Sequence, residues 1–170
     1  MQLLLTEIKN SANIIIEKKL SVTFLRLLLL SLLIIWTIGF LQPALLTQNN
    51  FLSHYFLTKI YSRVCHQESS KSIIIANESM LVCARCAGIY LGALIAGILI
   101  LFHSIPELKV KVFTIAVLPL LLDVCITFLG VYRYSQTVAF LTGLVLGSIV
   151  YLFLLSELEN LFSNKIHKKE

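Results

Sequence analysis

Residues 65–92 read CHQESSKSIIIANESMLVCARCAGIYLG, and they join a cysteine-rich segment directly to the start of an apolar helix. Three of the four cysteines of the chain lie here, at Cys65, Cys83 and Cys86. Cys83 and Cys86 are three residues apart, so their side chains share one face if the helix has begun at that point. The stretch therefore predicts a chemical site, which either holds a metal ion or cycles between thiols and a disulfide.

The rest of the chain has the composition of a membrane protein. Of its 170 residues 58% are hydrophobic and 14% are charged, and the mean hydropathy is +0.88. A spanning helix needs roughly 20 mostly apolar residues. Four stretches meet this requirement, at residues 24–46, 82–102, 110–130 and 137–156. We expect an all-α fold in one membrane domain over residues 1–170, a bundle of four transmembrane helices with a Cys/His loop at 47–82 between helices 1 and 2.

The basic residues flank the expected spans and do not gather on one soluble surface, which argues against a nucleic-acid partner. Nine Lys and Arg residues fall on the side of the two termini, and five fall on the side of the Cys/His loop. Cytoplasmic segments of membrane proteins carry an excess of Lys and Arg. We therefore expect both termini in the cytoplasm and the Cys/His loop at the outer face of a bacterial cytoplasmic (inner) membrane, with the lipid bilayer as the first partner.

Shorter segments between and before the spans also carry patterns. Residues 1–20 mix apolar and charged side chains, as in a short helix that lies on the inner membrane face. Residues 51–64 are amphipathic at helical spacing and predict a second interfacial helix, which leads to Cys65. Residues 67–79 are mostly polar and predict a loop, interrupted by the β-branched run Ile73 to Ile75.

Small residues recur at every fourth position of the second span, at Ala84, Gly88, Gly92 and Ala96. Ridges of this kind let two helices approach closely in lipid. The fourth span has the same spacing at Gly143 and Gly147, so it is a candidate partner surface. The ridge could serve the packing of the protomer's own bundle or a dimer equally well, so a homo-oligomer or another membrane partner is possible.

An acidic residue, Asp123, lies inside the third span. An intramembrane carboxylate is normally buried and paired, and Arg85 and Arg133 are the candidate partners. Asp123 precedes Gly130 by seven residues, which places it about 10 Å from the outer end of its helix. The expected topology thus brings Asp123 and Arg133 to the same end of the bundle as the cysteines.

A metal site is the first interpretation of this convergence. Three cysteines supply soft ligands, and tetrahedral zinc takes a fourth, for which His66, Asp123, Cys125 and water all remain open. Thiolate-rich sites favour zinc, although residue types alone also allow an iron–sulfur centre. The expected ligands are Cys65, His66, Cys83 and Cys86, and the expected supporting residues are Arg85, Tyr90, Asp123 and Arg133.

Thiol redox chemistry is the alternative. A Cys-x-x-Cys pair at a helix N-terminus has its thiolate stabilised by the helix dipole, and a membrane quinone would be the natural electron acceptor. The arrangement resembles the quinone-linked disulfide oxidases of bacterial inner membranes, but the cysteine pair of their second outer loop is missing here. A non-catalytic assembly subunit with a structural disulfide is a third possibility, so the sequence does not decide whether the protein is an enzyme.

The motifs around the cysteines also resemble one family of small bacterial membrane proteins, domain of unknown function 2085. The resemblance rests on Cys65-His66-Gln67, a basic residue before Ser72, and Cys83-x-Arg85-Cys86-x-Gly88-Ile89-Tyr90-x-Gly92. It continues through Asp123, Gly130, Ser135 and Thr142-Gly143. This chain has Lys71 where the family usually has Arg, and Val124 where the family tends to have Gly. The resemblance implies a shared site and leaves its chemistry open.

Overall fold

The computed structural model describes residues 2–45, 51–75, 78–103, 110–130 and 133–167. Its elements are, in chain order, α1 (Gln2–Leu45), α2 (Phe51–Tyr61), a 3-10 turn (Ser69–Lys71), β1 (Ser72–Ile75), β2 (Glu78–Cys83), α3 (Ala84–Phe102), α4 (Val110–Phe128) and α5 (Gln136–His167). Within these described residues, four segments are long and apolar enough to cross a membrane, namely Leu20–Pro43, Ala84–Phe102, Lys111–Phe128 and Gln136–Leu161. Each overlaps one expected span, so the helical four-span fold is confirmed.

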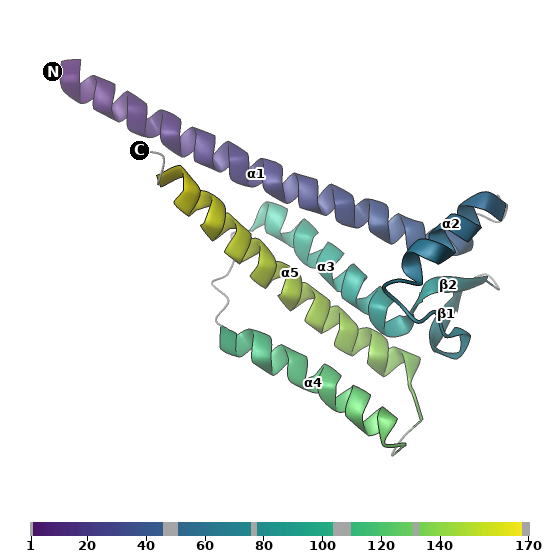
Figure 1. Cartoon of the computed structure of the whole chain (residues 1–170). Helices are drawn as coiled ribbons and strands as arrows, with labels where there is room; N and C mark the ends of the chain where they lie inside the picture. The colour runs from purple at the N-terminus through teal and green to yellow at the C-terminus, as the bar shows by residue number, and fades with distance from the viewer. Residues whose placement is uncertain (1, 46–50, 76–77, 104–109, 131–132, 168–170) are drawn as a thin grey trace.

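The four long helices lie side by side in the order α1, α3, α5, α4, and successive spans run in opposite directions (Figure 1). α3 and α5 form the most closely packed pair, while α4 packs mainly on α5. α2 and the two strands gather where α1 and α4 end and α3 and α5 begin (Figure 1). We call this the cysteine end; α1 begins and α5 ends at the opposite end.

Glycines allow α3 and α5 to approach within backbone contact. A Cβ atom added at Gly88 would lie 2.2 Å from the carbonyl oxygen of Phe140, and one added at Gly92 would lie 2.1 Å from that of Leu144. From the other side, a Cβ at Gly147 would lie 2.0 Å from the carbonyl oxygen of Ile89. The expected packing of the two small-residue ridges is confirmed, and its partner is within the same chain.

The loop expected over residues 67–79 includes β1 and the start of β2, which form a β-hairpin. β1 and β2 pair in antiparallel fashion, with Ser72 opposite Cys83 and Ile75 opposite Glu78. The β-branched run supplies β1, and Met80, Leu81 and Val82 of β2 are buried against α1 and α2. Because β2 occupies residues up to Cys83, α3 begins at Ala84 and not at residue 82 as expected. The amphipathic helix expected before Cys65 is present as α2.

Aromatic side chains fill the core beneath the hairpin. The Trp36 and Tyr61 rings lie 4.7 Å apart, and Phe40 and Tyr90 lie 5.8 Å apart. The buried hydroxyl of Tyr61 donates a hydrogen bond of 2.7 Å to the carbonyl oxygen of Trp36. This core joins α1, α2 and α3 and gives the hairpin a fixed surface to rest on.

At the opposite end, an ion pair fastens three helices. Arg26 of α1 donates through Nε and Nη2 to the two carboxylate oxygens of Glu159 of α5, at 2.7 and 3.1 Å. Its Nη1 also donates to the carbonyl oxygen of Ile100 at the end of α3, at 3.2 Å. Bidentate Arg–carboxylate pairs are geometrically specific, so this contact fixes the relative positions of α1, α3 and α5.

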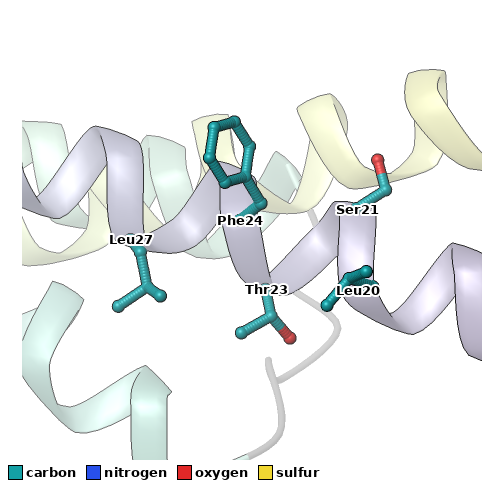
Figure 2. A pocket seen from close by; sticks show the side chains of 5 residues that line it. All are labelled: Leu20, Ser21, Thr23, Phe24 and Leu27. Atoms are coloured by element: carbon teal, nitrogen blue, oxygen red, sulfur yellow. The ribbon is translucent and has the colours of Figure 1, made fainter.

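The N-terminal part of α1 differs from expectation. Instead of a separate short helix over residues 1–20, α1 runs without a break from Gln2 to Leu45. The polar residues there lower hydropathy but do not stop a helix, because no Gly or Pro precedes Gly39. An apolar hollow of about 590 Å³ follows one stretch of α1, lined by Leu20, Ser21, Thr23, Phe24 and Leu27 (Figure 2). All five residues belong to α1, so the hollow lies on the surface of one helix, as expected of a surface that faces lipid.

Candidate functional site

Three cysteines meet at the cysteine end, each delivered by a different local structure. Cys65 follows α2, Cys83 closes β2 and is the N-cap residue of α3, and Cys86 lies in the first turn of α3. Their Sγ atoms all lie within 4.8 Å of one another. Among the described residues, no His, Asp or Glu side chain joins this group. We call these three residues the cysteine cluster.

Gln67 sets the path of the chain from Cys65 to the hairpin. Its backbone has a φ of +50°, in the left-handed region, which turns the chain sharply. Its side-chain Nε2 donates to two carbonyl oxygens, that of Thr58 in α2 at 3.2 Å and that of Leu81 in β2 at 3.0 Å. The loop that carries Cys65 is therefore tied to both neighbouring elements.

Backbone donors surround the sulfur atoms. The N–H of Cys83 donates to Sγ of Cys65 at 3.2 Å, and the thiol of Cys65 is buried. The pKa of Cys83 is lowered by hydrogen bonding from the Cys86 side chain and from the backbone N–H groups of Cys86 and Arg85, while burial acts against the shift. These contacts stabilise negative charge on sulfur, the state in which cysteine binds metals and attacks disulfides.

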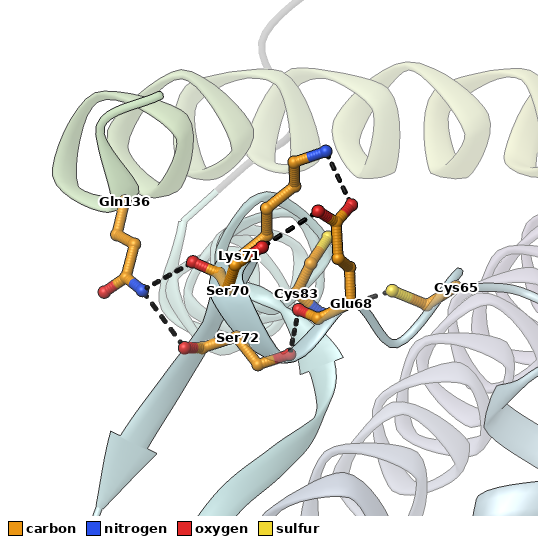
Figure 3. Close-up of polar contacts among 7 residues, drawn as sticks. All are labelled: Cys65, Glu68, Ser70, Lys71, Ser72, Cys83 and Gln136. Carbon is orange, nitrogen blue, oxygen red and sulfur yellow. Dashed lines mark hydrogen bonds and ion pairs between the residues drawn. The ribbon is translucent and has the colours of Figure 1, made fainter. Parts of the chain in front are cut away.

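Side chains at the base of the hairpin hold it against α5 (Figure 3). Gln136 at the start of α5 donates through Nε2 to the carbonyl oxygens of Ser72 at 3.1 Å and Ser70 at 3.4 Å. The buried Ser72 hydroxyl donates to the carbonyl oxygen of Glu68 at 3.2 Å. The Glu68 carboxylate accepts from Lys71 at 2.6 Å, which lowers the pKa of Glu68. These contacts hold the start of β1, where Ser72 pairs with Cys83 at the end of β2.

Arg85 and Asp123 form an ion pair between α3 and α4. The Asp123 side chain is 4% exposed, as expected of an intramembrane carboxylate, and its partner is Arg85 and not Arg133. Arg85 lies between Cys83 and Cys86 in sequence, so the pair links α4 to the segment that carries two of the three thiols.

The other expected site residues lie outside the cluster. His66 and Arg133 are exposed, and Cys125 is exposed on α4. Tyr90 packs beneath the site, with its ring 6.0 Å from that of Trp36. The structure therefore brings together Cys65, Cys83 and Cys86, pairs Arg85 with Asp123, and leaves the imidazole of His66 outside the group of sulfur atoms.

Two glutamines position the site, and neither was expected from the sequence to have a role. Gln67 belongs to the Cys-His-Gln string and lies two residues after Cys65, so its position was an available signal. Gln136 lies more than 60 residues from the hairpin that it contacts, and its hydrogen bonds have no local signature.

The donor set fits a thiophilic metal ion. Zn–S bonds of about 2.3 Å in a tetrahedron place sulfur atoms roughly 3.8 Å apart, which needs only a small contraction of the present cluster. A disulfide requires two sulfur atoms about 2.05 Å apart, whereas all three thiols are free here. The arrangement can hold a metal through three thiolates, or bring two thiols together for exchange.

Comparisons with known proteins show which family the chain resembles. The family described as Predicted membrane protein (DUF2085) matches residues 65–153, from the first cysteine of the cluster into α5. An uncharacterized protein of Methanocaldococcus jannaschii is 32% identical over 117 residues, covering 66% of this chain and 72% of the relative. That relative is archaeal, so the bacterial source expected from the sequence is not confirmed. No solved structure matches the chain. By the extent of both similarities, the chain belongs to the DUF2085 family of predicted membrane proteins.

Proposed function

We propose that this membrane protein binds one metal ion, most favourably zinc, through the thiolates of Cys65, Cys83 and Cys86. The observation that carries the proposal is the mutual approach of three sulfur atoms within 4.8 Å, from three different local structures. The side chains of Gln67 and Gln136 both hold the segments that converge at the cysteine cluster. A chance approach of three cysteines would not require these contacts.

The hydrogen bonding around the sulfur atoms supports thiolate ligands. A backbone N–H directed at Sγ of Cys65 stabilises a charged sulfur, and hydrogen bonds to ligand sulfur tune metal–thiolate centres. The fourth coordination position would be taken by water, by an external ligand, or by His66 after a rotation of its exposed side chain. Zinc with three protein ligands and one open position is the arrangement of catalytic sites, whereas a fourth protein ligand makes the site structural.

A bound ion would stabilise the cysteine end. It would connect α2, the hairpin and α3, and metal-binding free energy becomes folding free energy when the site is not formed in the unfolded chain. This role alone is enough for a non-catalytic subunit of a membrane assembly or a homo-oligomer.

Elemental analysis of the detergent-purified protein tests the proposal. We expect about one zinc per chain in the wild type, its loss in Cys83→Ser/Cys86→Ser, and its retention in Cys125→Ser. Cys125→Ser is the matched control because this exposed cysteine lies on α4, outside the cluster. Wild-type protein that folds, contains reduced thiols and takes up no zinc on addition would overturn the proposal.

Thiol–disulfide exchange is a second candidate, favoured by the same proximity of three free thiols. Two thiols would lose two electrons and two protons to form a disulfide, and a membrane quinone would accept them to become a quinol. A thiol count on the isolated protein separates the candidates. Two oxidised cysteines in metal-free wild type, released by reductant, would favour exchange over metal binding.

The orientation that we propose places both chain termini in the cytoplasm and the cysteine cluster at the outer face of a cytoplasmic membrane. The excess of Lys and Arg on the side of the termini supports this orientation.

A further inference from the structure

A pocket of about 380 Å³ opens at the cysteine end, on the side of α3 that faces α4. Its lining comes from the hairpin base, α3, α4 and the segment before α5, and consists of Lys71, Arg85, Val124, Thr127, Phe128 and Tyr134. Ligand sites in proteins are commonly of this size, with apolar walls and a few convergent polar groups. The cysteine cluster does not line this pocket.

Two buried hydrogen-bond donors of this wall have no partner among the described residues. They are Nε of Arg85 and the hydroxyl of Tyr134. Arg85 uses its Nη2 for Asp123, so Nε remains for another acceptor. An unmade hydrogen bond at a buried polar group costs roughly 1–3 kcal/mol, and such groups are rare in native proteins without an unseen ligand or water. Two in one pocket wall indicate an acceptor that binds there.

The charges around the pocket restrict the nature of this acceptor. Arg85 faces Asp123, and Lys71 faces Glu68, so the two positive and two negative groups balance. The Lys71–Glu68 pair is exposed and therefore weak, which leaves Lys71 available to a second anion. A ligand with one negative charge suits this environment better than a dianion such as a phosphate monoester.

The apolar side of the pocket faces outward from the bundle. Val124 and Phe128 belong to the lipid-accessible surface of α4, and Phe128 is 89% exposed. A small soluble anion would leave this apolar wall uncovered, whereas the glycerol backbone and acyl chains of a lipid would cover it. Lipid headgroups lie at the depth where a spanning helix such as α4 ends.

We propose that this pocket binds the phosphodiester group of a membrane phospholipid, with Lys71, Arg85 and Tyr134 as donors and Val124 and Phe128 against the lipid chains. A phosphodiester carries one negative charge and two free oxygen atoms, which matches the two unpartnered donors. Because neither donor atom is exposed, binding requires a small movement of the pocket wall. The two buried, unpartnered donors favour that movement.

Native mass spectrometry of the full-length protein in detergent tests this proposal. Three probes with shared parts are compared: phosphatidylglycerol, diacylglycerol with the same acyl chains, and the soluble diester glycerophosphoglycerol. We expect phosphatidylglycerol to bind at least tenfold more tightly than either of the others. Equal binding of diacylglycerol would show that the phosphate is not recognised, and equal binding of the soluble diester would show that the site is not a lipid site; either result overturns the proposal.

Tyr134→Phe and Tyr151→Phe form a matched pair of variants. Both remove a buried hydroxyl that has no partner among the described residues, but Tyr151 contacts Gly97 near the opposite end of the bundle. We expect Tyr134→Phe to weaken phosphatidylglycerol binding about fivefold to tenfold, from the loss of one hydrogen bond, and Tyr151→Phe to leave it unchanged.

Stability and metal content distinguish this proposal from the metal site. Without lipid, Tyr134→Phe should melt no lower than the wild type, because it removes an unpartnered group. With phosphatidylglycerol added, the melting temperature of the wild type should rise by more than that of Tyr134→Phe. Zinc content should stay the same in both variants. Equal lipid binding by Tyr134→Phe and wild type would overturn the lipid site and leave the metal proposal untouched.

Discussion

Gln67 shows how one residue outside the cysteine cluster controls its geometry. Its backbone φ of +50° turns the chain after Cys65, and its side chain holds α2 and β2 through two hydrogen bonds. These two contributions can be separated by substitution, because glycine accepts a positive φ at little cost whereas alanine does not.

We expect Gln67→Ala to lose about 2 kcal/mol of stability, since the carbonyl oxygens of Thr58 and Leu81 lose their partner. Gln67→Gly loses the same hydrogen bonds but relieves about 1 kcal/mol of backbone strain. Thermal unfolding in detergent should therefore rank the wild type above Gln67→Gly and Gln67→Gly above Gln67→Ala. If Gln67→Gly melts lowest, the positive φ is not a source of strain.

The Arg85–Asp123 ion pair gives a second prediction at this scale. Asp123→Asn leaves the largely buried Arg85 charge without its counter-charge and should cost about 3–5 kcal/mol. The double variant Arg85→Met/Asp123→Leu should recover most of this loss, because it removes both charges together. Thermal unfolding of the two variants and of the wild type measures the difference.

Metal content of the same variants adds a separate readout. Zinc should be retained in Asp123→Asn, because the carboxylate is engaged with Arg85 and lies outside the cysteine cluster. Loss of zinc in a folded Asp123→Asn protein would instead identify Asp123 as a ligand.

The sequence predicted the cluster more completely than its surroundings. Cys83 and Cys86 are three residues apart across the start of α3, so their proximity is local in the chain, and the expected topology adds Cys65. The pairing of Asp123 was also expected, with two candidate partners, because a carboxylate in a span needs a cation. The hydrogen bonds of Gln67 and Gln136 were not predictable, since they depend on the position of carbonyl groups in other elements.

Among the elements, α3 and α5 depend most on side-chain size. Gly147→Ile places a side chain where a Cβ would already lie 2.0 Å from the carbonyl oxygen of Ile89, so the two backbones must separate. We expect loss of the peak that the folded wild-type protein gives in size-exclusion chromatography. Val145→Ile is the control on the same helix, because Val145 is exposed and should accept the larger side chain. A stable, well-behaved Gly147→Ile protein would contradict the packing of these helices.

This contact was predictable because four-residue spacing of small side chains is a local pattern with one physical meaning in lipid. The hairpin, in contrast, was not predictable from the sequence. Polar residues over 67–79 favour a loop by composition, and only Ile73 to Ile75 pointed to a strand. Its formation depends on burial of Met80, Leu81 and Val82 against α1 and α2, which the sequence does not reveal.

For the whole molecule, the antiparallel order of spans places the start of α1 and the end of α5 on one side (Figure 1). With the proposed orientation, a green fluorescent protein fused after residue 170 should fluoresce, and alkaline phosphatase fused there should be inactive. Fusions after Phe128, where α4 ends at the cysteine end, should give the opposite pair of results. Reversed signals at both positions would retain the topology and invert the orientation.

The ion pair between Arg26 and Glu159 has a consequence for how the protein opens. It joins α1 to α5 at the end of the bundle opposite the cysteine cluster, and Arg26 also donates to the carbonyl oxygen of Ile100 near the end of α3. Removal of the proposed metal should therefore loosen α2 and the hairpin at the cysteine end, while the spanning helices stay joined. Hydrogen exchange after chelation should rise first in α2 and the hairpin, while the amides near Ile100 stay protected, so that metal loss appears as a local opening and not as unfolding of the membrane bundle.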